Sequence, residues 1–403
     1  MLNVEDAQKQ ILSGITPLAE ETVPLREALG RILAAPIVSP IDLPPFDNSA
    51  MDGYAVAAQD LRNSTAATPA ALRLIGRIAA GEVFQNRVLP GTCVRLFTGS
   101  PLPEGADAVI MQEDTRSDPA DPAKILCLDT VKSWENIRLK GEDVKCGTAL
   151  VAGGERLTAS RVGLLAAIGV TGVSVGRKPV VGLMATGSEL VEPGQKLGPG
   201  QIYESNRVGL SALVSQAGGQ ARILPLVNDT MESTCATLAQ AFNECDVVVS
   251  TGGVSVGEFD LVKAAFEKLG GKLAFWKVAM KPGKPFVFGK WREKFLFGLP
   301  GNPVSAFVTF LILVRPALLR FQRATAVHLS SHPGLLADAL ANRGDRRHFV
   351  RVKVEHDGSV RLAGIQASHI LSSLAGANGL VDIPPATEWP AGQSVSVLRW
   401  EQD

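Results

Sequence analysis

Small hydroxyl residues, glycines and carboxylates gather in three segments that directly follow predicted strands. The strands span 179–185, 246–250 and 295–299, and they run into Thr186–Glu189, Thr251–Asp260 and Pro300–Phe307. Parallel α/β sheets bind ligands beyond the carboxyl ends of their strands, so we expect the three turns to meet at one edge of a sheet. The glycines of Thr251–Asp260 would let backbone N–H groups approach an anion. This turn is not a P-loop, because it lacks the Gly-Lys-Ser/Thr ending and the G-x-G-x-x-G spacing.

Lysines stand close together just before the third of these strands. If the run 275–280 is extended, Lys277, Ala279 and Lys281 point to one face. The opposite face then carries the larger apolar side chains Trp276, Val278 and Met280. Such lysines could simply guard a solvated strand edge. Because Lys284 follows just beyond the next turn, the cluster favours binding of phosphate or another oxyanion.

Carboxylates occur in loops marked by Gly, Asn or Pro, namely Asp52, Asp143, Glu189, Asp229 and Asp260. A single Asp in a loop is more often a turn former than a ligand. Glu189, Asp229 and Asp260, however, follow strands of the same predicted sheet. Carboxylates that converge beside lysines suit a hard cation such as Mg²⁺ bridging phosphate oxygens.

Composition and spacing exclude several other classes of protein. Forty basic residues balance forty acidic residues, and aromatic residues make up 5% of the chain, so we expect no nucleic-acid or membrane partner. The cysteines show no C-x-x-C spacing, and the histidines show no metal-ligand spacing such as H-x-x-x-H on a helix, which disfavours disulfides and zinc. The acidic start and the reduced thiols predict a cytoplasmic protein.

The 403 residues predict a multidomain α/β plus β protein. Helical spacing at 4–15, 24–34 and 160–168 predicts a helical and extended N-terminal platform, at 1–40 and 141–177, around an inserted β-rich lid at 41–140. From residue 178 to 324, strands alternate with helices, which predicts a doubly wound, mostly parallel α/β domain closed by a helix over 303–321. Residues 325–403 predict a small, barrel-like β-domain.

Seven ordered segments resemble the molybdopterin molybdenumtransferase family, which includes the E domain of gephyrin. They are FDNSAMDGYAV (46–56), VRLFTGSPLPEGADAVIMQE (94–113), NIRLKGEDV (136–144), ATGSEL (185–190), TGGVSVGEFD (251–260), MKPGKPFVFG (280–289) and LPGNPVSAF (299–307). The resemblance covers nearly the whole chain. It implies an enzyme that hydrolyses adenylylated molybdopterin in the presence of molybdate and a divalent cation, releases AMP and leaves molybdenum on the dithiolene.

The resemblance also implies roles for individual residues. The nucleotide and pterin phosphates would be held by Gly252, Gly253, Ser255, Pro300, Asn302 and Ser305, and the lysine cluster adds Lys284. The cation and a water would be positioned by Glu189, Asp229 and Asp260, and the transferred phosphate neutralised by Lys277 and Lys281. The site would be completed by Asp52, Thr98 and Asp143, and molybdate would bind at Arg351 and Ser368.

By the same resemblance, the site lies between two subunits of a homodimer. The implied partners are a molybdopterin adenylyltransferase and the enzymes that receive the finished cofactor. Three positions depart from the family pattern: Ser188 and Glu204 stand where Asp is usual, and Phe259 where a small residue or Tyr is usual. Two alternatives remain, a non-catalytic scaffold or carrier that binds molybdopterin nucleotide, and an amidohydrolase or nucleotide hydrolase that shares only the α/β domain.

Overall fold

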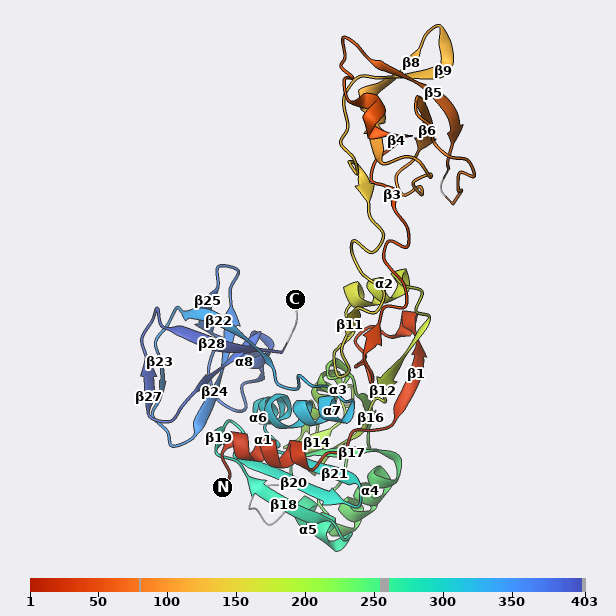
Figure 1. Cartoon of the computed structure of the whole chain (residues 1–403). Coiled ribbons are helices and arrows are strands. Elements are labelled where there is room, and N and C mark those ends of the chain that lie inside the picture. The colour runs from red at the N-terminus through yellow and green to blue at the C-terminus, as the bar shows by residue number, and fades with distance from the viewer. Residues whose placement is uncertain (80, 254–260, 401–403) are drawn as a thin grey trace. The chain divides into compact units, whose positions relative to one another are not determined.

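The computed structural model describes residues 1–79, 81–253 and 261–400. It groups the chain into two compact units (Figure 1). The core unit comprises 1–35, 153–158 and 172–403, and the inserted unit comprises 36–152 and 159–171. The four-part domain division expected from the sequence stays a prediction.

A six-stranded sheet forms the centre of the core unit, in the order β16-β13-β17-β21-β20-β18. Its strands are β13 (Val180–Ala185), β16 (Gln220–Ile223), β17 (Val247–Thr251), β18 (Lys272–Lys277), β20 (Pro285–Trp291) and β21 (Lys294–Leu299). The first four in the order run parallel, whereas β20 and β18 are antiparallel to their neighbours. The predicted mostly parallel α/β sheet is therefore confirmed.

Helices cover both faces of this sheet, as expected for a doubly wound domain (Figure 1). One face packs against α1 (Val4–Ser13), α3 (Asn206–Gln216), α6 (Pro303–Thr309) and α7 (Arg315–Phe321), and the other against α4 (Met231–Glu244) and α5 (Leu261–Lys268). Apolar periodicity decides which side is buried: α1 buries Val4, Ala7 and Ile11. Asn3 caps this helix, because its side chain accepts a hydrogen bond from the Asp6 N–H at 2.7 Å.

The predicted helix over 303–321 is continuous but changes its winding in the middle. A π-helical segment, Phe310–Val314, joins α6 to α7. The Gln8 side chain donates to the Ile312 carbonyl at 2.9 Å and so satisfies one carbonyl of this segment. Within the described residues, this is the one helix long and apolar enough to cross a membrane, but 83% of its window is buried inside the molecule.

The helix expected over 24–34 is wrong. The strand β1 (Glu20–Pro24) pairs with β12 (Gly172–Gly176), and a 3₁₀ turn, Leu25–Glu27, follows. Gly30 then adopts a φ of +75°, which ends helical winding. The next residues form backbone hydrogen bonds with distant segments, for example from Leu33 N–H to the Glu155 carbonyl at 2.9 Å. Tertiary pairing has overridden the helical spacing here.

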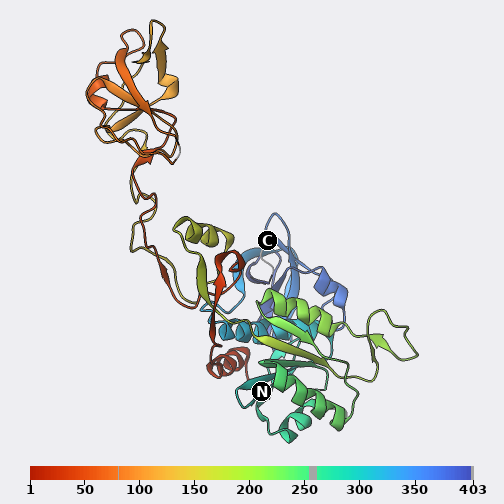
Figure 2. The same ribbon diagram turned by 90° about the vertical axis from the view of Figure 1, so that its right-hand side faces the viewer.

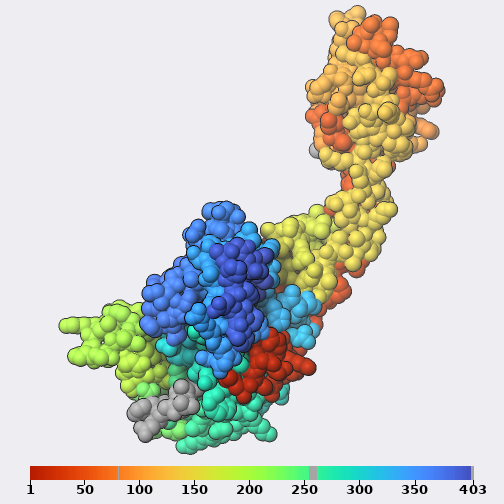
Figure 3. All heavy atoms as spheres, turned by 90° about the vertical axis from the view of Figure 1, so that its left-hand side faces the viewer, coloured from red at the N-terminus to blue at the C-terminus, as the bar shows by residue number. Residues whose placement is uncertain are grey.

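A small closed β-barrel completes the core unit. Its strands are β22 (Ser330–Leu336), β24 (Arg347–Val354), β25 (Ser359–Leu362), β26 (Gly379–Ile383) and β28 (Ser394–Arg399). Pairing of β24 with β26 closes the ring and confirms the predicted barrel. The short strand β19 (Met280–Lys281) pairs in parallel with β24, so the barrel is attached to the segment that leaves β18. Figure 3 shows the barrel in blue, packed against the rest of this unit.

Short paired strands and one short helix supplement the sheet and the barrel. They are β14 (Leu190–Val191) with β15 (Ile202–Tyr203), β23 (Leu340–Asn342) with β27 (Thr387–Trp389), and α8 (Leu371–Ala375). The segment that carries β14 and β15 projects from the sheet in Figure 2.

The inserted unit is rich in short strands, as predicted. Its sheet has the order β7-β4-β6-β5-β9-β8. These strands are β4 (Gly53–Val56), β5 (Ala70–Arg77), β6 (Thr92–Leu96), β7 (Ala108–Met111), β8 (Thr115–Asp118) and β9 (Asp121–Cys127). Two further pairs, β2 (Ile37–Val38) with β11 (Ala149–Val151) and β3 (Asn48–Ser49) with β10 (Ile137–Arg138), lead into it, and α2 (Ala159–Ala167) follows.

Candidate functional site

The turns that follow the parallel strands meet at the carboxyl edge of the sheet. Thr186, directly after β13, forms a parallel bridge with Val227, which lies beyond β16. The Thr186 N–H donates to the Thr251 carbonyl at 3.2 Å, and the Gly252 N–H donates to the Leu299 carbonyl at 3.2 Å. Backbone hydrogen bonds therefore hold together the turns expected to meet.

The glycine turn after β17 needs glycine for its conformation and its packing. Gly252 and Gly253 have φ angles of +78° and +65°. A Cβ atom on Gly252 would lie 2.8 Å from the Thr186 carbonyl oxygen, and one on Gly253 would lie 2.7 Å from Cγ2 of Val262. The backbone here is thus free of side chains, as an anion cradle requires. Ser255 and Asp260 lie outside the described residues.

The turn after β21 lies against the glycine turn. A Cβ atom on Gly301 would lie 3.6 Å from the Gly252 Cα, and the Asn206 side chain donates to the Gly301 carbonyl at 2.7 Å. Pro300 and Ser305 are buried, whereas Asn302 is exposed. The Asn302 amide donates to the Ser368 hydroxyl at 3.2 Å, which connects this turn to the C-terminal barrel.

Two of the predicted carboxylates follow neighbouring strands. Asp229 Oδ2 accepts hydrogen bonds from the Ser188 N–H at 2.9 Å and the Ser188 hydroxyl at 3.1 Å. Glu189, the next residue along this turn, is exposed. The described residues contain no group of three His, Cys, Asp or Glu that could hold a metal ion. The third predicted carboxylate, Asp260, belongs to the segment that is not described.

The lysines are placed differently from the expectation. Trp276 is 41% exposed, whereas Val278 and Met280 are fully buried, so these three residues do not share a face. The pairing of β18 with β20 is irregular between Phe275 and Lys277, and the chain then joins β24 through β19. Lys277 and Lys281 thus belong to different sheets, and the prediction of one extended run is wrong. Lys281 and Lys284 are exposed, and Lys277 is half-buried.

The barrel residues predicted to bind molybdate include a fully buried arginine. Arg351 Nε donates to the Ser373 hydroxyl at 2.9 Å, and Nη2 donates to the carbonyls of Ile365 and Ala367 at 3.0 and 3.2 Å. Nη1 is buried and has no hydrogen-bond partner among the described residues. Burial lowers the pKa of this guanidinium, which remains a cation at neutral pH. Ser368, next to Ala367, is half-buried.

A buried histidine lies beside these cations. His348 pairs with Lys281 across β24 and β19 and is 7% exposed, and its Nε2 has no hydrogen-bond partner in the part of the chain that the structure describes. Burial, with smaller contributions from the charges of Lys281, Arg351 and Arg346, lowers the pKa of His348 to about 4. The imidazole is therefore neutral at physiological pH.

The inserted unit contains the remaining predicted residues. Asp52 Oδ1 accepts from the N–H and the hydroxyl of Thr98, both at 2.8 Å. The backbone and side-chain hydrogen bonds from Thr98 hold the pKa of the Asp52 carboxyl below its ordinary value, with a smaller contribution from the charge of Arg95. Asp143 is exposed, and its N–H donates to the Leu43 carbonyl at 3.0 Å. Asp52 and Thr98 are thus brought together.

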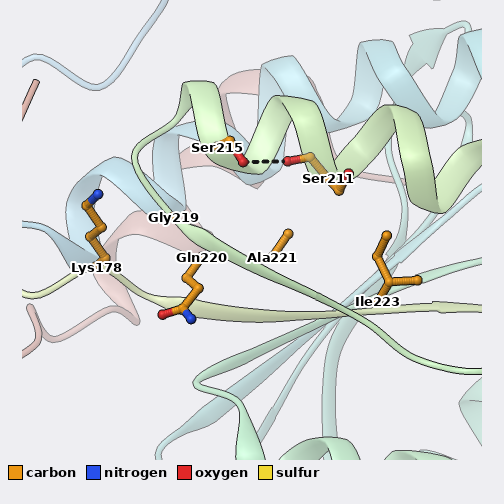
Figure 4. A pocket seen from close by; sticks show the side chains of 7 residues that line it. All are labelled: Lys178, Ser211, Ser215, Gly219, Gln220, Ala221 and Ile223. Atoms are coloured by element: carbon orange, nitrogen blue, oxygen red, sulfur yellow. Dashed lines mark hydrogen bonds between the residues drawn. The ribbon is translucent and has the colours of Figure 1, made fainter.

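A surface hollow of about 480 Å³ opens beside the edge strand β16 (Figure 4). It is lined by Lys178, Ser211, Ser215, Gly219, Gln220, Ala221 and Ile223. The Ser215 hydroxyl donates to the Ser211 carbonyl at 3.0 Å within α3. None of the lining residues is a predicted site residue, so the hollow does not belong to the sheet edge described above.

Comparison with known proteins covers almost the whole chain. Residues 2–169 match the MoeA N-terminal region (domain I and II), residues 182–320 a probable molybdopterin binding domain, and residues 333–400 the MoeA C-terminal region (domain IV). A molybdopterin molybdenumtransferase of Haemophilus influenzae is 38% identical over 94% of this chain and 93% of its own length. The chain belongs to the molybdopterin molybdenumtransferase family. It is therefore an enzyme, a transferase of molybdenum cofactor biosynthesis.

Other members of the molybdopterin molybdenumtransferase family match over similar lengths. The Bacillus subtilis relative is 35% identical over 94% of this chain and 89% of its own length. A crystal structure of the molybdopterin biosynthesis moeA protein from Pyrococcus horikoshii OT3 has a TM-score of 0.85 and 34% identity, covering 99% of this chain and 100% of that chain. The fold is thus the fold of this family.

Two departures from the molybdopterin molybdenumtransferase pattern have structural explanations. The Ser188 hydroxyl donates to Asp229, a hydrogen bond that an ionised Asp at this position could not make. Glu204 is buried and accepts from Arg207 Nε at 2.9 Å, while Arg207 Nη2 donates to Glu192 at 2.7 Å. The longer Glu side chain is therefore part of an ion-pair group. The third departure, Phe259, lies outside the described residues.

Sequence reasoning gave no individual role to two residues at the sheet edge, although Thr186 begins one of the turns expected there. Thr186 packs under both glycines of the turn, and Asn206 binds the carbonyl of Gly301. Thr186 could have been found because it is the first residue after a buried strand, where ligand-side residues of α/β sheets occur. Asn206 offered a weaker signal, since Asn at the start of a helix is usually explained by capping.

Proposed function

We propose that this enzyme hydrolyses adenylylated molybdopterin and inserts molybdenum from molybdate into the dithiolene, releasing AMP. In the hydrolysis, water attacks a phosphorus of the phosphoanhydride and the bridging P–O bond breaks. AMP is released, and molybdopterin keeps its own phosphate. The observation that carries the proposal is the meeting of the glycine turn, the Asp229 turn and the Gly301 turn at one sheet edge. Such an edge offers side-chain-free N–H groups to phosphates.

The cations would act on the phosphates at the start of the reaction. Lys277, Lys281 and Lys284 lie on the segment that links the sheet to the barrel, and their charges would attract the phosphoanhydride. Gly252, Gly253, Pro300, Asn302 and Ser305 would hold the nucleotide and pterin phosphates, together with Ser255 of the undescribed segment. The described members of the second set come from the glycine turn and the Gly301 turn, which the backbone contacts given above connect.

The carboxylates fit a hard divalent cation such as Mg²⁺. Among the described residues, no group donates a hydrogen bond to Asp229 Oδ1, and Glu189 is exposed on the neighbouring turn. Oxygen ligands of this kind suit Mg²⁺. We assign the cation to Glu189, Asp229 and Asp260. When bound, it would neutralise charge on phosphate oxygens.

Molybdate would bind at the barrel. Arg351 Nη1 is a buried N–H donor that no described residue provides with an acceptor, and a tetrahedral oxyanion would supply one. Ser368 lies one residue from the carbonyl that Arg351 already binds, and it contacts Asn302 of the sheet-edge turn. Molybdate held there would be close to the turn that we assign to the phosphates.

We also propose a homodimer in which each inserted unit completes the site of the partner. Asp52 and Thr98, which resemble family site residues, lie in the inserted unit, whereas the other site residues except Asp143 lie in the core unit. Mixing inactive Asp52→Ala chains with inactive Glu189→Ala chains should restore part of the activity through mixed dimers. Confirmed chain exchange without activity would place both residues in the same subunit.

The setting of the reaction follows from its substrates. The substrate requires a molybdopterin adenylyltransferase as supplier, and the product requires molybdenum cofactor enzymes as receivers, so we propose both as partners. All five cysteines are free thiols, which suits a reducing, cytoplasmic compartment.

The direct test combines two readouts in one sample. Pure protein is incubated with adenylylated molybdopterin, Mg²⁺ and molybdate, and AMP is measured together with reconstitution of an apo-molybdoenzyme. We expect AMP and active cofactor to appear in equal amounts. AMP without active cofactor would reduce the function to nucleotide hydrolysis, and tight nucleotide binding without AMP would indicate a carrier.

A further inference from the structure

Two lysine ammonium groups lie over the exposed indole ring of Trp276 in the core unit. Lys277 Nζ lies 3.7 Å from the ring centroid of Trp276, and Lys263 Nζ lies 4.5 Å from it. Lys277 ends β18, whereas Lys263 lies in the first turn of α5, so two elements bring their cations to the same ring. Both distances are within the range of cation–π attraction.

The local backbone explains how adjacent residues come to share a face. In a regular strand, Trp276 and Lys277 would point to opposite sides. The irregular pairing between Phe275 and Lys277 breaks this alternation, and irregularities of this kind re-aim side chains. The result leaves Trp276 41% exposed, although a large apolar ring gains most by burial.

Within the described part of the chain, the two ammonium groups have no carboxylate partner. Among the described residues, neither Lys263 nor Lys277 has a carboxylate within ion-pair distance. Two like charges on one ring repel each other, and attraction to the π face offsets that repulsion only in part. An anion bound between the two cations would remove the remaining repulsion.

Backbone hydrogen bonds beside Lys263 and Lys277 connect these residues to the glycine turn and to Lys284. The Val262 N–H, next to Lys263, donates to the Gly253 carbonyl of the glycine turn at 3.3 Å. On the other side, the Val278 N–H, next to Lys277, donates to the Lys284 carbonyl at 3.2 Å. The residues next to the two lysines are thus hydrogen-bonded to the glycine turn and to Lys284.

We infer that Lys263, Trp276 and Lys277 form one phosphate-binding group, in which Lys263 is a further substrate-binding residue and Trp276 positions both cations. The ligand class is a phosphoanhydride or a phosphate dianion. The inference rests on the proposed function, since it takes the ligand to be the phosphates of adenylylated molybdopterin. The competing explanation is a solvated edge strand, β18, guarded by lysine.

The test uses substitutions that change one feature at a time: the charge of a lysine, the aromatic ring, or a lysine elsewhere on the surface. Lys263→Met removes one cation, Trp276→Leu removes the ring but keeps an apolar side chain, and Trp276→Phe keeps a weaker ring. Lys268→Met, on the exposed end of the same helix, is the matched control. Binding of inorganic pyrophosphate is measured by titration calorimetry at several salt concentrations, and KM and kcat are measured with adenylylated molybdopterin.

We expect Lys263→Met and Trp276→Leu each to raise the pyrophosphate Kd and the KM about 5- to 20-fold, with kcat changed less than 2-fold. Lys263→Met should flatten the salt dependence of Kd, and Trp276→Phe should recover most of the affinity. If both variants bind pyrophosphate like Lys268→Met while Lys277→Ala binds it weakly, this inference is wrong and the proposed function stands. If the parent releases no AMP but the variants still lose pyrophosphate binding, the proposed function fails and the anion site stands.

Discussion

The carboxyl edge of the sheet and the C-terminal barrel present their polar groups in different ways. At the edge, Glu189 and Asn302 are exposed, and backbone hydrogen bonds between turns set their positions. In the barrel, Arg351 and His348 are buried, and each has a nitrogen without a partner. A buried donor without an acceptor costs about 1–3 kcal/mol, which a bound oxyanion would regain. The comparison separates an exposed edge, which can exchange ligands with water, from a barrel in which buried nitrogens of Arg351 and His348 have no partner among the described residues.

The largest expected effect tests the chemistry assigned to the sheet edge. Asp260→Asn keeps the shape of the side chain and removes its charge, so it should slow AMP release roughly 10²–10⁴-fold. Binding of adenylylated molybdopterin should stay the same or become tighter, because a repulsion with phosphate is lost. Single-turnover AMP release and equilibrium binding check both halves. Asp338→Asn, exposed on the barrel, is the control. If Asp260→Asn releases AMP at the parental rate, the glycine turn only holds the phosphates and takes no part in the hydrolysis.

The second prediction tests whether the edge depends on bare backbone. Gly252→Ala places a Cβ 2.8 Å from the Thr186 carbonyl oxygen at a φ of +78°. We expect a loss of stability of about 1–2 kcal/mol and a nucleotide Kd raised at least about tenfold, which corresponds to about 1.4 kcal/mol. Gly358→Ala in the barrel has a similar φ of +81° and open space around it. Equal nucleotide affinity in the two variants would contradict the cradle.

The third prediction concerns the barrel and pH. The folded-state pKa of His348, about 4, lies below its ordinary value of 6.5, so the unfolded chain binds more protons between these pH values. Stability is therefore complete above about pH 6.5 and decreases as the pH falls toward 4, by up to about 1.4 kcal/mol per pH unit. His348→Gln should flatten the dependence of the unfolding free energy on pH, measured by urea unfolding at a series of pH values. The exposed His332→Gln should keep the parental slope, and a parental slope in His348→Gln would refute the assignment.

The comparison also shows what the sequence could predict. The sheet edge was predictable because Thr186, Gly252 and Pro300 directly follow buried apolar strands, and parallel strands bring such positions together. The barrel fold was predictable from its alternating strands. The partnerless Nη1 of Arg351 was not, because it depends on carbonyls of a loop far along the chain.

The two wrong predictions, the helix over 24–34 and the face of Trp276, have a common physical cause. The segment 24–34 has helical spacing, but its backbone pairs with residues 155–157 and 174–176, which no local pattern shows. Trp276 reads as a core residue by alternation, and an irregular pairing with β20 turns it outward. Long-range backbone pairing overrode local propensity in both cases.

The central claim is that the sheet edge binds the nucleotide and the barrel binds molybdate. The most direct measurement titrates both ligands against Lys277→Met and Arg351→Lys, with thermal unfolding as a check on folding. Arg351→Lys keeps the charge but loses the fork of donors, so it should raise the half-saturating molybdate concentration roughly 10- to 100-fold and leave the nucleotide Kd within about 2-fold. Lys277→Met should show the reverse pattern. If either folded variant shifts both ligands by the same factor, the two regions form one undivided site and the account is wrong.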